Sequence, residues 1–238
     1  MKIDQLSLVI EGKRLLDQVS FEIPQSSLFI ILGPNGAGKT LLLRCLAGFQ
    51  EPSTGRIIRE VEDLAWVPLS QPLPFGFQVS DVLLMGRYRQ HQGFPGSRDR
   101  ERIAETAKRL DITHLLARQY NSLSRGEQTK VDITRAVASE SMLILLDEPF
   151  SNLDIDASLQ MIDLFKDLQR SGKTLILSHH DLYSVKDLAT HGLLMKKGQV
   201  VTHGPIDEVF QPSWIQEAYN VKPVFGGEGS LRFEKRGL

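Results

Sequence analysis

The segment "GPNGAGKT", residues 33–40, indicates the fold of this chain more strongly than any other stretch of its sequence. It satisfies the pattern G-x-x-x-x-G-K-[ST] and lies between an apolar run, "LFIIL" (28–32), and a helical run, "LLLRCLAG" (41–48). Glycines in such a segment let the backbone curl until its N–H groups point at phosphate oxygens, and the helix that follows adds positive potential. A plain glycine-rich turn with a helix cap is the competing interpretation, which the strand and helix context disfavours. We therefore expect a nucleotide to bind at Gly33, Pro34, Asn35, Gly36, Ala37, Gly38, Lys39 and Thr40.

Four side chains are expected to act at the terminal phosphates. Lys39 would reach the β- and γ-phosphates, and Thr40 would offer its hydroxyl to Mg²⁺. The run "LILLDEP" (143–149) ends a buried strand with Asp147 and Glu148, and the carboxyl ends of parallel strands face one crevice. Asp147 can therefore hold Mg²⁺ while Glu148 deprotonates an attacking water. The alternative is a solvated acid pair after a core strand.

Two adjacent histidines follow another apolar run, "TLILS" (174–178). His179 and His180 can therefore approach the same crevice. A neutral imidazole can donate one hydrogen bond and accept another, which suits a sensor of the terminal phosphate. A purely structural histidine is equally consistent with the residues alone.

The segment "LSRGE" (123–127) begins a helix in the sequence pattern. Ser124 and Glu127 fit the S-x-x-E capping box, in which each side chain bonds the backbone N–H of the other residue. Local physics accounts fully for these two residues. It gives no reason for Arg125 between the serine and Gly126.

The remaining pattern predicts an α/β fold. The apolar runs at 28–32, 143–147 and 174–178 lack polar alternation, as strands of a parallel sheet do. The opening runs "KIDQLSLVI" (2–10) and "QVSFEIP" (18–24) indicate antiparallel strands. A surface helix is expected between residues 156 and 172. Its apolar side would carry Leu159, Ile162, Phe165 and Leu168, with Gly172 at its end.

A helical lobe is expected from about residue 71 to residue 121, where the strand pattern disappears. The segments 80–86, 99–112 and 113–118 indicate short helices, and residues 87–97, "RYRQHQGFPGS", indicate a loop. The tail, residues 221–238, suggests two short strands about a glycine turn.

Composition excludes several classes of function. The 28 basic and 29 acidic residues nearly cancel, which disfavours electrostatic binding to nucleic acid or to anionic lipid. The chain shows no signal peptide or membrane-spanning run, so we expect a cytoplasmic protein whose membrane attachment goes through a partner. The single cysteine, Cys45, lies among apolar residues and suggests a buried thiol.

Five motifs now stand in one order: "GPNGAGKT", "LSRGE", "LILLDEP", "SNLD" (151–154) and "SHHD" (178–181). In this the chain resembles the ATPase subunit of an ATP-binding cassette (ABC) transporter, from its first strands to about Val209. The resemblance implies a P-loop NTPase core, a mainly parallel sheet with flanking helices, with an antiparallel β subdomain and an inserted helical subdomain. It divides one domain, 1–238, into the core and β subdomain (1–70 and 141–220), the helical subdomain (71–125) and a tail (221–238).

The resemblance also implies roles for particular residues. It assigns ATP and Mg²⁺ to the site, with Asp147 at the metal, Glu148 as catalytic base and His180, rather than His179, as the switch histidine. In a head-to-tail dimer, one subunit's helix start would face the other subunit's ATP, and residues 151–154 would line the seam. Beyond the phosphate loop, the residues implied to contact nucleotide are Gln71, Ser124, Arg125, Gly126, Glu127 and Asp154.

Three positions depart from the family's pattern. Ile10 stands where an aromatic residue usually stacks on adenine, so only an apolar contact is expected there. Leu69 stands where a glutamine usually joins the γ-phosphate and Mg²⁺ to the helical lobe, so either Gln71 replaces it by a shift of the loop or water does. Arg125 stands in place of a glycine. Together these three departures support a further alternative, in which the chain is a subunit that binds nucleotide but hydrolyses it slowly.

Within the family, the segments at 80–96, 110–124 and 208–221 look most like ATPases that import iron chelates, haem, cobalamin or metal ions. The implied partners are a transmembrane permease, a second copy of the chain and, indirectly, an extracytoplasmic substrate-binding protein. The implied location is the inner face of the cell membrane. The alternatives are an exporter ATPase and a soluble ABC ATPase such as a metal-cluster assembly factor.

Overall fold

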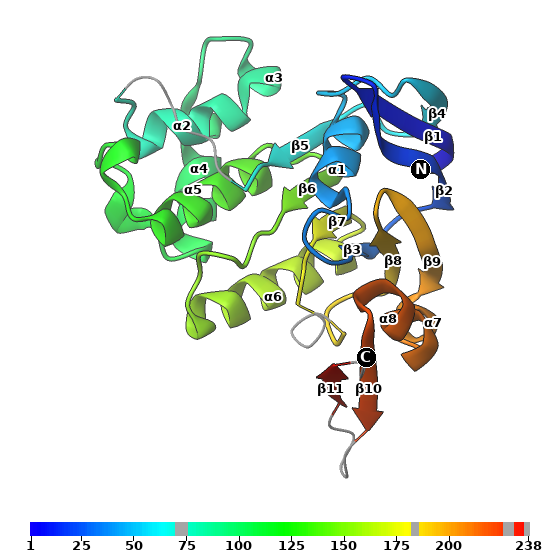
Figure 1. The fold of residues 1–238 in the computed structure, drawn as a ribbon. Helices are drawn as coiled ribbons and strands as arrows, with labels where there is room; N and C mark the ends of the chain where they lie inside the picture. The colour runs from blue at the N-terminus through cyan, green and yellow to red at the C-terminus, as the bar shows by residue number, and fades with distance from the viewer. Residues whose placement is uncertain (70–75, 182–185, 226–230, 236–238) are drawn as a thin grey trace. The chain divides into compact units, whose positions relative to one another are not determined.

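The computed structural model describes residues 1–69, 76–181, 186–225 and 231–235, so Gln71 lies outside the described residues. The chain forms two compact units, one made of Met1–Glu60 with Thr174–Leu238 and the other of Val61–Lys173. Each unit combines strands with helices (Figure 1). In the described part of the chain, no helix is both long and apolar enough to cross a lipid bilayer.

The first unit contains an antiparallel sheet in the order β2-β1-β4. Strands β1 (Lys2–Ile10) and β2 (Lys13–Glu22) pair as predicted, and β4 (Thr54–Ile58), which the sequence analysis did not anticipate, pairs with the other edge of β1. Gly55 lies so close to β1 that a Cβ there would stand 2.3 Å from the Gln5 carbonyl oxygen. The antiparallel β subdomain therefore contains three strands and depends on a glycine contact between two of them.

The same unit contains the strand that leads into the phosphate loop. Strand β3 (Leu28–Leu32) lies between β7 (Thr174–Ser178) and β8 (His191–Lys196) and runs parallel to both. Strand β9 (Gln199–Pro205) pairs antiparallel with β8. All five residues of β3 are buried, which is why its sequence shows no polar alternation. Helix α1 (Lys39–Ala47) begins in the phosphate loop and ends at Gly48, which adopts a left-handed φ of 83°.

The C-terminal part of this unit packs beside β8 and β9. It contains α7 (Ile206–Val209), α8 (Pro212–Tyr219) and the antiparallel pair β10 (Val221–Phe225) and β11 (Leu231–Lys235). The prediction of two short strands in the tail is confirmed. Figure 1 shows β10 leaving the end of α8, so the position of the helix fixes where the hairpin starts.

The second unit contains two parallel strands and the longest helices. Strand β5 (Leu64–Val67) pairs with β6 (Leu143–Asp147), and α5 (Arg125–Ala138) contacts β5. Helix α6 (Ile155–Arg170) ends as predicted before Gly172, whose φ is 93°. The predicted face of α6 is partly wrong, because Leu159 is exposed and Met161 and Leu164 are buried instead. A repeat of three residues turns away by about 60° at each step of a 3.6-residue helix, so it cannot stay on one face.

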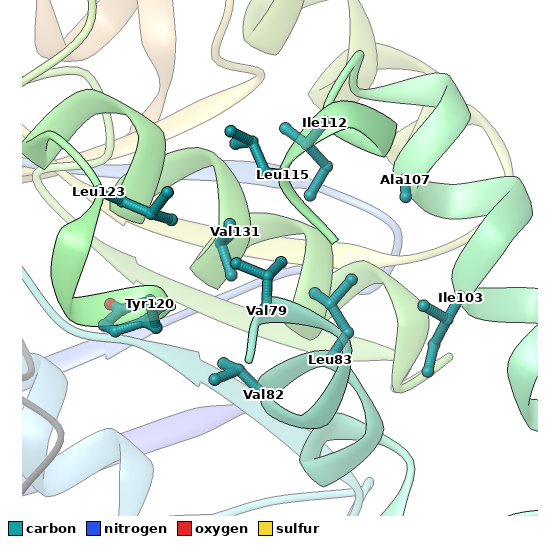
Figure 2. Close-up of a cluster of buried hydrophobic side chains, with 10 residues drawn as sticks. All are labelled: Val79, Val82, Leu83, Ile103, Ala107, Ile112, Leu115, Tyr120, Leu123 and Val131. Carbon is teal, nitrogen blue, oxygen red and sulfur yellow. The ribbon is translucent and has the colours of Figure 1, made fainter. Parts of the chain in front are cut away.

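The helical lobe of this unit has its own apolar core. Its elements are α2 (Val79–Gly86), α3 (Tyr88–His91), α4 (Ser97–Arg109) and the 3₁₀ turns η1 (Thr113–Leu115) and η2 (Tyr120–Ser122). Figure 2 shows side chains from α2, α4, η1, η2 and α5 converging. The cluster contains Val79, Val82, Leu83, Ile103, Ala107, Ile112, Leu115, Tyr120, Leu123 and Val131. The predicted helical lobe is thus a packed structure that includes the start of α5.

Two details of the lobe correct the prediction. The segment expected to be only a loop contains the single turn α3, and the third predicted helix is only a 3₁₀ turn. The buried Arg87 fixes the start of α3, since its Nε donates to Asp99 Oδ1 at 2.8 Å and its Nη1 to the Ala138 carbonyl oxygen at 2.7 Å. Asp99 also accepts the Gly96 N–H at 3.0 Å, which starts α4 two residues before the predicted position. Long-range ion pairing therefore orders a segment whose local pattern indicates a loop.

Candidate functional site

The phosphate loop has the curled backbone that its glycines predict. Gly33, Gly36 and Gly38 have φ angles of 148°, 78° and 101°, values that L-residues with a Cβ rarely adopt. Gly33 also lies against β8, where a Cβ would stand 2.4 Å from the Met195 carbonyl oxygen. At Gly38 a Cβ would stand 2.9 Å from Leu16 Cδ2. The neighbouring strands thus require glycine at both ends of the curl.

Lys39 places a positive charge inside this curl. Its side chain is buried, and its Nζ donates to the carbonyl oxygens of Gly33 at 2.8 Å and Pro34 at 3.2 Å. Asn35 and Gly36, at the tip of the loop, are exposed, as is Thr40 at the start of α1. An exposed curl with an ammonium at its base and a helix N-terminus behind it fits the phosphates of a nucleotide.

The two histidines follow β7, which lies beside β3. Ile31 pairs with Ser178, and the His179 N–H donates to the Ile31 carbonyl oxygen at 3.0 Å. His179 is buried, whereas His180 is exposed, and their ring centroids are 5.2 Å apart. Within this unit, the structure therefore brings His180 beside the strand that carries the phosphate loop and leaves it accessible.

In the second unit, the carboxylate pair stands at the end of β6, as predicted. Asp147 is buried, and the next residue, Glu148, has a left-handed φ of 48°. Such a conformation costs about 1 kcal/mol or more for a residue other than glycine. Ser151 holds it in place, because its N–H and its Oγ both donate to the Glu148 carbonyl oxygen, at 3.2 Å and 3.0 Å. The chain therefore turns sharply at Glu148, directly after the end of β6.

The start of α5 is a capping box, as the sequence predicts. The Ser124 N–H donates to Glu127 Oε2 at 2.7 Å, and Ser124 Oγ accepts the Glu127 N–H at 3.3 Å. The Glu127 carboxylate also accepts from Arg118 Nη1 at 3.0 Å. The hydrogen bond from the Ser124 N–H is the main reason that the pKa of Glu127 is lowered. Glu127 therefore serves the cap as an anion.

Gly126 joins this helix start to the loop after Glu148. A Cβ on Gly126 would stand 2.8 Å from the Asn152 carbonyl oxygen, so the two backbones are in contact within one chain. Arg125 Nη1 lies 3.5 Å from Gln128 Oε1 along the helix. Asp154 caps α6, since its Oδ1 accepts the Ala157 N–H at 2.8 Å. The second unit thus brings together, within one chain, residues 124–127 and residues 151–154, both of which were expected to lie at the dimer seam.

A cluster of buried polar side chains on α5 and η2 was not predicted from the sequence. The Tyr120 hydroxyl donates to Asp132 Oδ2 at 2.8 Å, and Arg135 Nη2 lies 3.5 Å from Asp132 Oδ1. Burial raises the pKa of Asp132, against the opposing effects of Arg135 and Tyr120. An aspartate between the apolar residues Val131 and Ile133 was the available signal. The hydrogen bond between Tyr120 and Asp132 attaches η2, the turn before "LSRGE", to helix α5.

Two of the expected metal donors lie in different units. Thr40, in the first unit, and Asp147, in the second, each carry the kind of oxygen that Mg²⁺ prefers. Among the described residues, no group of three His, Cys, Asp or Glu side chains is placed to hold a metal ion. Ile10 is partly buried at the end of β1, and Leu69 is exposed after β5.

Known proteins resemble this chain over most of its length. The family model for the ABC transporter matches residues 16–151. The manganese transport system ATP-binding protein MntB of Halalkalibacterium halodurans is 32% identical, over 92% of this chain and 91% of that protein. The hemin import ATP-binding protein HmuV of Gloeobacter violaceus is 30% identical, over 94% of this chain and 88% of that protein.

Solved structures share the fold. One, assigned to the metal-chelate type of ABC transporter and in an inward-facing conformation, matches with a TM-score of 0.84 and 28% identity, over 98% of this chain and 95% of that chain. An ATP-binding cassette in its ADP conformation matches with a TM-score of 0.79 and 22% identity, over 92% of this chain and 97% of that chain. The predicted α/β class is confirmed by both likenesses.

Proposed function

This chain belongs to the ABC transporter family, and we propose that it is the ATP-hydrolysing subunit of an importer for metal ions, haem or chelated iron. Subunits of this family hydrolyse ATP and work with membrane permeases. The observation that carries the choice of substrate class is the similarity, over about nine-tenths of the chain, to ATP-binding proteins of manganese and zinc transport and of hemin import. The names of all three relatives favour transport over a soluble assembly factor, and the name of the hemin protein favours import over export.

The first unit would bind the nucleotide. The backbone N–H groups of residues 33–40 would cradle its phosphates, and Lys39 would exchange the Gly33 and Pro34 carbonyl oxygens for phosphate oxygens. Ile10 offers the base an apolar side chain and no aromatic ring to stack on. We therefore expect the site to select adenine over other bases less strongly than it selects the triphosphate group.

Hydrolysis would depend on oxygen donors and bases from both units. Thr40 and Asp147 would hold Mg²⁺, which supplies positive charge to the phosphate oxygens when bound. Glu148 would take the proton of the attacking water, and His180 would hydrogen-bond the terminal phosphate. The position of these two residues at the end of the buried strand β6 supports this assignment, because the carboxyl ends of parallel strands are where such sheets bind ligands.

A second copy of the chain would complete the site. Ser124 and the backbone at Gly126 would face the γ-phosphate held by the other subunit, and Arg125 would add a positive charge at the seam. Gly126 has a further role within the chain, since the Asn152 backbone fills the space where its Cβ would be. A substitution at Gly126 would therefore disturb both faces of the seam, whereas Arg125→Gly leaves the capping box intact.

The permease would anchor the chain at the inner face of the membrane, and an extracytoplasmic protein would deliver the substrate. The test is transport by the chain purified with its permease in proteoliposomes. We expect ATP-dependent import of Mn²⁺, Zn²⁺, haem or a ferric chelate, and no import with Glu148→Gln. Movement of these substrates only in the outward direction, or hydrolysis that no member of the panel stimulates when its binding protein is added, would refute the proposal.

A further inference from the structure

The end of helix α8 is anchored beside the phosphate loop. Ile215 and Ala218 are buried on its inner face, and Lys196, the last residue of β8, donates from its Nζ to the Glu217 carbonyl oxygen. Asn220 ends the helix in a left-handed conformation, with its N–H bonded to the Gln216 carbonyl oxygen at 3.0 Å. Tyr219, the last residue of α8, is therefore held by the packing of the helix and by its cap.

The Tyr219 hydroxyl contacts the backbone at two places in the nucleotide site. It donates to the His180 carbonyl oxygen over a long distance of 3.4 Å. It also has a hydrogen bond with the Gly33 backbone. Because that bond lowers the pKa of Tyr219, the Gly33 N–H is its donor. One hydroxyl thus accepts from the first residue of the phosphate loop and donates to the residue after the buried histidine.

Tyr219 keeps its proton under ordinary conditions. Burial raises the pKa of Tyr219, and the nearby Asp181 raises it further, while the Gly33 hydrogen bond opposes them. A neutral hydroxyl can donate and accept at once, whereas a phenolate could not donate to a carbonyl oxygen. The bridge between Gly33 and His180 therefore needs the protonated hydroxyl, which is the form of Tyr219 at physiological pH.

The bridge lies where strand pairing no longer fixes the backbone. The parallel register of β3 and β7 includes Ile31 with Ser178, and β3 ends one residue before Gly33. Beyond these positions both segments leave the sheet. Gly33, which has a φ of 148°, is a glycine, and its backbone can adopt other conformations about as readily. A hydrogen bond to each segment from a third, rigid element restricts how far they can move apart.

We propose that Tyr219 is a positioning residue for ATP hydrolysis, whose hydroxyl holds His180 at a fixed place relative to the phosphate loop. This inference rests on the proposed role of His180 at the terminal phosphate. Tyr219 touches neither nucleotide nor water in this role and acts only through the two backbones. The residue lies outside residues 16–151, so the family model gives no indication of it.

The test is Tyr219→Phe, which removes the hydroxyl and keeps the ring. In steady-state ATPase assays of the chain with its permease, we expect kcat to fall about three- to tenfold, the size that loss of one neutral hydrogen bond produces. The KM for ATP should change by less than about twofold, because the phosphate contacts remain. The matched control is Trp214→Phe on the exposed side of the same helix, which should leave both constants unchanged.

A double-mutant cycle with His180→Ala, measured under single-turnover conditions, identifies the route of the effect. If Tyr219 acts through His180, Tyr219→Phe slows the wild type but causes no further loss in the His180→Ala background. An equal loss in both backgrounds, or none in either, overturns the role of Tyr219 and leaves that of His180 standing. A His180→Ala variant as fast as the wild type would instead refute the proposed role of the histidine, and the inference with it.

Discussion

Gly33→Ala should destabilise the chain far more than the same change three residues later. At Gly33 the φ of 148° is nearly forbidden to alanine, and the new Cβ would stand 2.4 Å from the Met195 carbonyl oxygen and 3.0 Å from Ala37 Cβ. The backbone strain costs roughly 1–3 kcal/mol and the overlap roughly another 1–3 kcal/mol. We expect the free energy of unfolding to fall by about 2–6 kcal/mol, a large part of the ~5–15 kcal/mol that keeps a typical domain folded.

Gly36→Ala is the control, because Gly36 lies in the same loop and has space around it. Its φ of 78° is also positive, but no atom lies within 4 Å of where its Cβ would be. Only backbone strain is expected to destabilise this variant, by about 1–2 kcal/mol. The difference between the two variants therefore reports the overlap with Met195 and Ala37 together with the larger backbone strain at Gly33.

The measurement is urea unfolding without nucleotide, followed by circular dichroism. We expect a lower midpoint for Gly33→Ala than for Gly36→Ala, with similar slopes. Equal midpoints would show that β8 does not press on the loop, and the steric reason for glycine at residue 33 would be wrong. A changed slope would mean that the variant alters the unfolded or native ensemble, so the midpoints would be compared only where the slopes agree.

Three further predictions concern charged groups. Lys39→Ala should weaken ATP binding about 10–100-fold by removing a charged hydrogen-bond donor, and an unchanged Kd in a titration would contradict this. Glu148→Gln should lower kcat at least about 100-fold while ATP still binds, which single-turnover hydrolysis can measure. Burial raises the pKa of Asp132, so its contribution to stability is present at low pH and is lost as pH rises through the folded-state pKa. The free energy of unfolding of wild type relative to Asp132→Asn should therefore fall as pH rises above about 4, the ordinary pKa of an aspartate, and a rise would refute the assignment.

Local chemistry made several features predictable from the sequence. The capping box at Ser124 and Glu127 is confirmed because it depends only on residues three apart. Gly172 ends α6 as predicted because a left-handed residue is needed there whatever the surroundings. Cys45 is buried, as its apolar neighbours indicated, and burial raises the pKa of its thiol to about 11.

Features set by distant partners were not predictable. The turn α3 depends on Arg87 contacting Asp99 and Ala138, and nothing in the local pattern distinguishes it from a loop. The contact of Gly126 with Asn152 and the bridge from Tyr219 likewise join segments far apart in the sequence. The roles of Asp147, Glu148 and the "LSRGE" segment in catalysis stay predictions, because they concern a nucleotide and a second subunit.

The left-handed turn at Glu148 sets protein stability and turnover against each other at one position. Glycine would adopt the φ of 48° without strain and would relieve roughly 1 kcal/mol, while losing the carboxylate proposed as the base. A library of variants selected only for heat resistance should therefore accumulate Glu148→Gly, and one selected for transport should never contain it. Stabilising variants of this chain should therefore keep Glu148 and carry their substitutions at other positions.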